Sequence, residues 1–262
     1  MHPDIIKLYE DIMTTSIMLV TYNRLEFTKR MFDNFFKTTD GPYRLLIVDN
    51  GSTDGTKEWL EKLPEQLSVD CKIHFNPVNK GIAMGRNQGL LMANKYGAED
   101  EFLATIDNDV EFPDKWLSQC TDIIKDKDGN RITIGVSFEN DDYELVTRKD
   151  KTFQLKKAGN LGTACSVFHR DLHKKTGYFT TDYGIYGEED ADFFFRARLV
   201  GWEVGYLKDK GHHFDETVVA TEGYREFKTA AHKNNLVKFQ NNCYAYTYRI
   251  KPVFIPYHGP SM

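Results

Sequence analysis

The chain of 262 residues is 40% hydrophobic and carries a formal net charge of −5, from 34 basic and 39 acidic residues. This length accommodates one large domain or two small ones around a sizeable core. Because acids outnumber bases, no overall field favours a polyanion, and the charge does not indicate nucleic acid as the main partner.

The cysteines and the hydropathy pattern are typical of a soluble, cytoplasmic protein. No zinc-type pair spacing occurs, which favours free or buried thiols in a reducing compartment. Residues 1–15 carry three acids and no long apolar core, unlike a secretory signal, and no apolar run approaches the length of a membrane span. The four cysteines are Cys71, Cys120, Cys165 and Cys243.

In the first half of the chain, short apolar runs alternate with segments of helical periodicity. Strands and helices in this rhythm predict an α/β fold, a doubly wound and mostly parallel sheet flanked by helices, with its site at the carboxyl ends of the strands. The expected strands are residues 16–20, 44–48, 71–75 and 102–106, and the expected helices are residues 24–37, 54–63 and 81–96.

A polar cluster follows the first expected strand. It reads Thr21-Tyr22-Asn23-Arg24 and offers an aromatic face, an amide and a cation to a nucleotide base or a phosphate. A helix N-cap explains Asn23 equally well.

Two further clusters follow the second and third strands. Asp49 and Asn50 open a glycine-containing turn with exposed backbone donors, although ordinary loop composition accounts for most of it. Lys80 and Gly81 precede a helix that carries Arg86. Because the helix dipole disfavours a cation at this end, Lys80 suggests an anionic ligand.

The fourth strand runs into Asp107-Asn108-Asp109. Residues two apart in an extended chain point the same way, so Asp107 and Asp109 can face one spot. Two such carboxylates repel each other unless a cation such as Mg²⁺ or Mn²⁺ lies between them or between one of them and a phosphate. A solvated acidic turn is the alternative interpretation.

The second half of the chain predicts a helix over residues 114–125, strands over residues 132–138, 163–168 and 203–207, and a charged surface hairpin or loop over residues 139–157. Glu188, Glu189 and Asp190 open a further helix that continues to Leu199. Acids in a first helical turn are favoured by the dipole, so helix capping alone could explain them.

This ordered series of clusters resembles the nucleotide-sugar half of glycosyltransferase family 2, over about residues 16–215. The resemblance implies a GT-A fold, a single Rossmann-like α/β domain. It also implies that Thr21, Tyr22 and Asp49 hold the base, and that Arg86 and Asp107 reach the ribose or sugar. The remaining expected nucleotide-sugar contacts are Asn23, Arg24, Asn50, Lys80, Gly81 and Asn108.

The same resemblance assigns a metal and a base. Asp109 would coordinate a divalent cation, Mn²⁺ or Mg²⁺, bound to the diphosphate. Asp190 would be the general base, and Glu189 would assist acceptor binding. The family often places a metal-ligand histidine where this chain has His212 and His213. Neighbouring residues of an extended segment face opposite sides, so one of the two points inward, unless the histidine is simply a buried structural one.

The expected activity is a metal-dependent, inverting transfer of one sugar from a nucleotide-diphosphate sugar, with UDP favoured by family habit, to the hydroxyl of a glycan or another acceptor. The processive-synthase signature Gln-x-x-Arg-Trp is missing. A sugar-nucleotide pyrophosphorylase is one alternative, but it would carry a Gly-rich, Arg-containing loop after the first strand. A non-catalytic nucleotide-sugar binding protein is another, and Asp190 counts against it.

We expect a GT-A domain over residues 1–222, with its nucleotide-sugar half at residues 16–112 and its acceptor half at residues 113–222. Residues 223–262 form a basic, aromatic, helical extension. Such a composition can hold an anionic acceptor or a membrane surface, or it can be a helix packed over the domain with its lysines in water.

Overall fold

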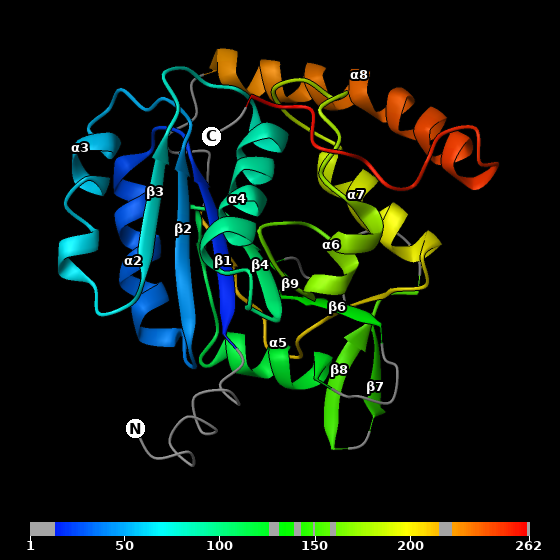
Figure 1. The fold of residues 1–262 in the computed structure, drawn as a ribbon, viewed down its shortest axis with the longest axis horizontal. Helices are drawn as coiled ribbons and strands as arrows, with labels where there is room; N and C mark the ends of the chain where they lie inside the picture. The colour runs from blue at the N-terminus through cyan, green and yellow to red at the C-terminus, as the bar shows by residue number, and fades with distance from the viewer. Residues whose placement is uncertain are drawn as a thin grey trace.

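The computed structural model describes residues 14–125, 131–138, 143–148, 150–157, 161–214 and 222–260 (Figure 1). Its centre is a nine-stranded sheet in the order β3-β2-β1-β4-β9-β6-β10-β8-β7. The strands are β1 (Thr15–Thr21), β2 (Tyr43–Asp49), β3 (Cys71–Phe75), β4 (Phe102–Ile106), β6 (Ile132–Gly135), β7 (Glu144–Arg148), β8 (Lys151–Leu155), β9 (Cys165–His169) and β10 (Glu203–Tyr206), while β5 (Val110–Glu111) and β11 (His212–His213) form a separate ribbon.

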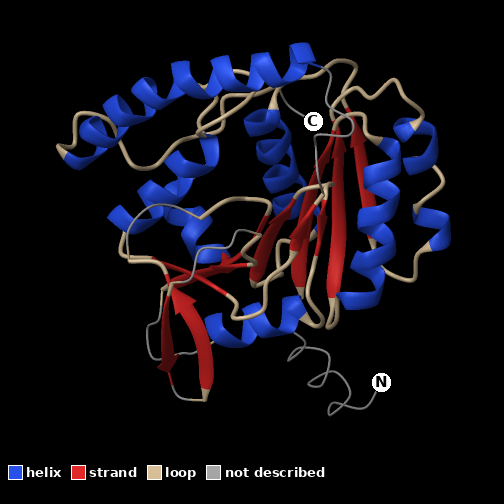
Figure 2. Ribbon diagram, turned by 180° about the vertical axis from the view of Figure 1, so that it is seen from behind, coloured by secondary structure: helices blue, strands red, loops and turns tan. Residues whose placement is uncertain are grey.

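Helices cover both faces of this sheet (Figures 1 and 2). They are α2 (Leu25–Thr38), α3 (Thr56–Leu60), α4 (Ile82–Tyr96), α5 (Trp116–Ile124), α6 (Arg170–Thr176), α7 (Glu189–Leu199) and α8 (Glu222–Thr247), with a short 3-10 turn over Pro64–Gln66.

The two halves of the sheet are paired differently. β3, β2, β1 and β4 are parallel to one another. β9 runs antiparallel to both β4 and β6, β10 returns parallel to β6, and the β7–β8 hairpin extends the edge antiparallel to β10. The doubly wound, parallel first half is therefore as predicted. The antiparallel strand β9 joins it to a second half in which parallel and antiparallel pairs are mixed.

Several elements differ from the sequence prediction. The helix expected over residues 54–63 ends at Leu60, because Pro64 has no N–H to donate to the carbonyl of that residue. The strand expected over residues 132–138 ends at Gly135. Helix α6 and the β5–β11 ribbon were not predicted, since neither has enough residues to show a periodicity.

Alternate residues of β1 face two separate cores. Ile17 and Leu19 pack with α2 and α5 side chains, whereas Met18 packs with side chains of α4 and α7. Helix α4 lies very close to β1, because a Cβ on Gly85 would lie 2.7 Å from a methyl of Val20. Glycine at this position therefore lets α4 sit directly on the strand.

Helix α8 lies along one edge of the molecule beside α7 (Figures 1 and 2). Asn235 donates hydrogen bonds to the carbonyls of Tyr183 and Tyr186, at 2.8 and 2.9 Å. The hydroxyl of Tyr246 donates to the buried carboxylate of Asp192 at 3.0 Å. The extension predicted over residues 223–262 thus packs firmly on the rest of the chain. None of the helices in the described ranges is long and apolar enough to cross a bilayer.

Candidate active site

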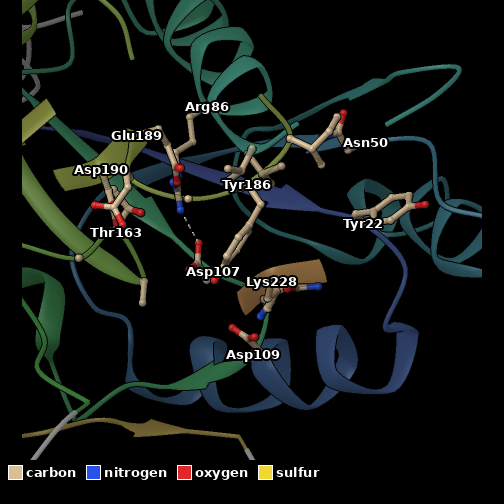
Figure 3. Close-up of a pocket in the computed structure, with 18 of the residues that line it drawn as sticks. Tyr22, Asn50, Arg86, Asp107, Asp109, Thr163, Tyr186, Glu189, Asp190 and Lys228 are labelled. Atoms are coloured by element: carbon tan, nitrogen blue, oxygen red, sulfur yellow. Dashed lines mark hydrogen bonds and ion pairs between the residues drawn. The ribbon is translucent and has the colours of Figure 1, made fainter. Parts of the chain in front are cut away.

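A cavity of about 840 Å³ opens at the carboxyl ends of β1, β2 and β4 (Figure 3). Its wall also takes side chains from α4, from the start of α7 and from the first turns of α8. In Figure 3, Tyr22 and Asp190 lie at opposite ends of this wall, with Asp107 and Asp109 between them. The polar clusters that follow separate strands in the sequence therefore converge on one space.

The loops after β1 and β2 are held together by a buried carboxylate. Asp49 is 0% exposed and accepts hydrogen bonds from the Thr21 hydroxyl at 3.0 Å, and from the Ser52 amide and hydroxyl at 3.0 and 2.5 Å. Neither Thr21 nor Asp49 is among the lining residues of the cavity, whereas the half-exposed ring of Tyr22 is. In this structure the pair fixes the loop that presents Tyr22.

Asn23 belongs to the same hydrogen-bond network, which joins the loop after β1 to the loop after β2. Its backbone N–H donates to the Ser52 hydroxyl at 2.7 Å, and its side-chain oxygen accepts from the Thr53 amide at 2.8 Å. Asn23 and Arg24 both have positive φ, at 55° and 63°, which L-residues rarely adopt. This hydrogen-bond network therefore holds a strained turn that points Arg24 into the cavity.

Asn50 ties the end of β2 to the loop before α4. Its side-chain nitrogen donates to Asn79 at 3.0 Å and to the carbonyl of Gly81 at 3.1 Å. Its oxygen accepts from the backbone of Lys80 and from Asn76, both at 3.1 Å. Asn50 and Asn79 line the cavity, and the side chain of Lys80 does not.

Gly81 joins this loop to the second half of the chain. It has a φ of 87°, and a Cβ there would lie 2.8 Å from the carbonyl oxygen of Gly184. The next residue, Ile82, donates its N–H to the carbonyl of Ile185 at 3.1 Å. Only glycine permits this close contact, which brings the loop before α7 over the start of α4.

Arg86 bridges two acidic clusters that lie far apart in the sequence. Its guanidinium donates to Glu189 at 2.5 Å and to Asp107 at 3.0 Å. Burial, with the neighbouring charge of Asp190, raises the pKa of Glu189 to about 7, although Arg86 opposes this shift. The other carboxylate oxygen of Glu189 is buried and has no hydrogen-bond partner among the described residues.

Asp109 faces a different pair of groups. One oxygen accepts from Arg24 at 2.8 Å, and the other lies 3.6 Å from Nε2 of His213. Asp107 and Asp109 thus line the same cavity with different partners. Asn108 between them also lines the cavity, and its side-chain nitrogen donates to the Thr28 hydroxyl on α2 at 2.9 Å.

The β5–β11 ribbon brings the two histidines beside the acidic cluster. His213 pairs with Val110 and His212 pairs with Glu111. Because neighbouring strand residues face opposite sides, only His213 reaches the cavity wall. Carboxylate oxygen and imidazole nitrogen are suitable ligands for Mn²⁺. Across the described ranges, however, no three His, Cys, Asp or Glu side chains gather as a preformed metal cluster.

The start of α7 supplies the remaining acids. Asp190 lines the cavity, and among the described residues its carboxylate accepts one hydrogen bond, from the N–H of Ala191 at 2.7 Å. A carboxylate oxygen of Glu188 lies 2.7 Å from Nδ1 of His232 on α8. Burial raises the pKa of Glu188 as well, although the neighbouring His232 acts to lower it.

Sequence reasoning missed part of the site. Tyr186 and the α8 residues Phe227, Lys228 and His232 also line the cavity, and the Lys228 ammonium lies 5.0 Å from the centre of the Tyr186 ring. The basic, aromatic composition of the extension was the available signal, but it does not reveal which lysine faces inward.

Comparison with known proteins shows the family to which the chain belongs. The family model for Glycosyl transferase family 2 matches residues 16–200, so the chain belongs to glycosyl transferase family 2, as the motifs predicted. No curated protein matches the chain significantly.

Solved structures share the fold. The mannosyltransferase PcManGT of Pyrobaculum calidifontis, in complex with GDP-Man and Mn²⁺, is 17% identical, with a TM-score of 0.61 over 89% of this chain and 69% of that one. GalNAc-T7 with UDP, GalNAc and Mn²⁺ is 16% identical, with a TM-score of 0.61 over 78% of this chain and 44% of that one. S. aureus TarS 1-349 with UDP-GlcNAc is 20% identical, with a TM-score of 0.58 over 82% of this chain and 64% of that one. These likenesses confirm the GT-A fold, and the chain spans less than two thirds of the last two structures.

Proposed function

We propose that the protein is an inverting glycosyltransferase that moves one sugar from a nucleotide-diphosphate sugar to an acceptor hydroxyl with the help of a divalent cation. The observation that carries this proposal is the order of side chains along one cavity. An exposed aromatic ring, two acidic residues beside arginines, and a carboxylate at a helix start follow one another in Figure 3. This order matches that of base, diphosphate, sugar and acceptor in such a reaction.

The donor would lie across the ends of β1, β2 and β4. The Tyr22 ring, 44% exposed, would stack on the base, and Arg86 with Asp107 would hold the ribose or sugar. Asn50, Asn23 and their partners would fix the loops that shape this part of the cavity. Two of the three structures named above contain UDP or a UDP-sugar, which favours uridine in the donor.

Asp109 and His213 would hold the cation, since their oxygen and nitrogen are of the chemistry that Mn²⁺ accepts and lie 3.6 Å apart. Two of the structural neighbours contain Mn²⁺. When bound, the cation supplies neutralising charge for the diphosphate leaving group. Because Arg24 holds the second oxygen of Asp109, its guanidinium would turn to the diphosphate as the donor enters.

Asp190 would take the proton from the acceptor hydroxyl. The acceptor oxygen forms a bond to the anomeric carbon, the bond from that carbon to the diphosphate breaks, and the proton passes to the Asp190 carboxylate. Attack opposite the leaving group inverts the configuration, and no second nucleophile is needed. Glu189 would keep Arg86 in position and assist acceptor binding at the same end of the cavity.

The described cysteines, Cys71, Cys120, Cys165 and Cys243, are all free thiols. This supports our proposal that the protein works in a reducing compartment such as the cytoplasm.

A panel of nucleotide sugars, each assayed with Mn²⁺, with Mg²⁺ and with a chelator, tests the proposal. We expect one donor to release its nucleotide diphosphate only when a cation is present. We expect an α-linked donor to give a β-linked product by NMR. If no donor binds with any cation, or if the configuration is retained, the proposal fails. Release of pyrophosphate would instead indicate nucleotidyl transfer, and binding without turnover would indicate a sensor.

A further inference from the structure

The cavity wall contains a histidine and a glutamate that have no role in the proposed reaction. His232 of α8 and Glu188, the residue before α7, both line the cavity. Nδ1 of His232 lies 2.7 Å from a carboxylate oxygen of Glu188. The Glu188 side chain is 9% exposed and the His232 side chain is 65% exposed. A nearly buried carboxylate therefore holds one edge of an imidazole whose other edge is open.

The carboxylate decides which imidazole nitrogen carries the proton. In a neutral histidine, one ring nitrogen donates a hydrogen bond and the other accepts one. Because an ionised carboxylate can only accept, Nδ1 of His232 carries the proton and donates it to Glu188. Nε2 then keeps its lone pair, so the open edge of the ring offers a hydrogen-bond acceptor.

The backbone places this pair beside the proposed base. Glu188 has a positive φ of 67°, and its carbonyl accepts a hydrogen bond from the N–H of Asp192 at 2.9 Å. Its turn is therefore continuous with the first turn of α7, which carries Asp190. The negative charge of Asp190 contributes to the raised pKa of Glu188, as expected for two carboxylates that lie close together.

Helix α8 is held where it presents the imidazole. Asn235, which follows His232 by three residues, is 6% exposed and donates hydrogen bonds to two carbonyls of the loop before α7, at 2.8 and 2.9 Å. Gly187 of that loop packs against the helix, because a Cβ there would lie 3.9 Å from the Cα of His232. The ring is thus positioned by its helix and by its carboxylate partner before a ligand binds.

Several polar atoms at this end of the cavity can take a further partner. The second carboxylate oxygen of Glu189 is buried and has none among the described residues. The Asp190 carboxylate accepts one N–H, and Nε2 of His232 makes no hydrogen bond to a described residue. A hydroxyl can meet each of these atoms, since it both donates and accepts. One hydroxyl cannot meet them all, whereas a sugar ring brings several.

We propose that His232 is an acceptor-binding residue, whose Nε2 accepts a hydrogen bond from a second hydroxyl of a sugar acceptor while Asp190 takes the proton of the first. This inference rests on the proposed transfer reaction and narrows its acceptor. A sugar is favoured over a serine or threonine side chain or a simple alcohol, because these have no second hydroxyl for His232.

The test compares acceptors and measures donor binding separately. Each donor that the nucleotide-sugar panel shows to be turned over is assayed with the methyl glycosides of glucose, galactose and N-acetylglucosamine, and with N-acetylthreonine methylamide as the single-hydroxyl acceptor. We expect one glycoside to have a kcat/KM at least about tenfold above that of the threonine compound. Calorimetry with the released nucleotide diphosphate and Mn²⁺ measures binding at the donor site.

Two substitutions separate contact with the acceptor from contact with Glu188. An asparagine can keep the N–H bond to Glu188 but is too short to replace Nε2, so His232→Asn should raise the KM of the glycoside about tenfold. The longer glutamine places an oxygen near the position of Nε2, so His232→Gln should recover part of this loss. Nucleotide affinity should be the same in both variants.

Asn234→Ala is the matched control. Asn234 is exposed on the same helix and is not among the residues that line the cavity. Its replacement should leave the KM of the glycoside unchanged.

Three results would overturn the proposal. The first is an unchanged glycoside KM in His232→Asn, which would mean that His232 only tethers Glu188. The second is a loss of nucleotide affinity in His232→Asn as large as the rise in glycoside KM, which would place His232 at the donor. The third is equal use of the threonine compound and the glycosides. All three leave sugar transfer standing; if no donor is turned over at all, the proposed function fails, and this inference fails with it.

Discussion

The cavity has a strand side, formed by the loops after β1 and β2, and a helix side, formed by the starts of α7 and α8. On the strand side, the buried polar groups are satisfied: Asp49 accepts three hydrogen bonds and the Asn50 side chain makes four. On the helix side, Glu189 has a buried oxygen without a partner among the described residues, and its pKa is raised.

This difference in hydrogen bonding suits the strand side to hold the donor and the helix side to carry out the reaction. Satisfied networks are rigid, so the strand side can present Tyr22 and the loop before α4 in one fixed shape. A carboxylate surrounded by donors is a weak base, since those donors stabilise its charged form. The Asp190 carboxylate lines the cavity and accepts one hydrogen bond, from the N–H of Ala191, so an acceptor hydroxyl can reach it. The two sides should therefore respond to mutation in different ways.

The largest effect should come from Asp190→Asn, which removes the proposed base without changing its size. We expect transfer to fall by about 10³-fold to 10⁴-fold, at the upper end of what a positioned base contributes. Nucleotide affinity, measured by calorimetry, should not change. The matched change on the strand side, Asp49→Asn, should weaken nucleotide binding instead. If Asp190→Asn remains active, another group is the base.

Arg196→Met tests what positions the helix side. Arg196 and Asp192 are both 0% exposed and 2.7 Å apart, and Arg196 also donates to the carbonyls of Thr176 and Tyr178. Removing one partner of a buried ion pair leaves the other charge uncompensated, so we expect a loss of about 3–5 kcal/mol in the free energy of unfolding. Urea denaturation measures it. Arg198→Met, on the same helix but half-buried, should cost much less, and an equal cost would contradict the argument.

Glu189→Gln tests the raised pKa. With a pKa of about 7 in the folded protein and an ordinary value of 4.5, Glu189 binds a proton between these limits that the unfolded chain has released. Stability should therefore fall as pH rises through this window, by up to about 3 kcal/mol. Urea denaturation at several pH values should show this fall in the unmodified protein. The fall should be smaller in Glu189→Gln, and identical profiles would mean that Arg86 keeps Glu189 ionised.

The strand side could be predicted from sequence far better than the helix side. The bounds of β3 and β4 agree with the predicted strands, because continuous apolar runs and the polar residues that end them are local signals. Parallel topology then brings the polar clusters to one edge of the sheet without further information. The family and the GT-A fold followed from the order of those clusters.

The features of the site that the sequence could not predict depend on contacts between segments far apart in the chain. Which histidine faces the cavity is decided by the two-residue β5–β11 ribbon, which has no periodicity to read. The inward position of Lys228 depends on how Asn235 and Tyr246 dock α8 onto α7. The Arg86–Glu189 bond joins residues 103 positions apart, so the sequence alone could not show that the buried acid shares its cation with Asp107.

The smallest effect should come from Lys228→Met, which asks whether α8 belongs to the helix side of the site. The Lys228 ammonium would attract a diphosphate, so its loss should raise the donor KM by about three- to tenfold, or roughly 1 kcal/mol, with kcat nearly unchanged. The increase should shrink at high salt, because screening already weakens the charge. Lys37→Met is the control: Lys37 is exposed in the last turn of α2, at the opposite end of the sheet from the cavity. Initial rates across donor concentrations should separate the two variants. Equal KM values for both would mean that α8 only covers the cavity, and that the strand side binds the donor without it.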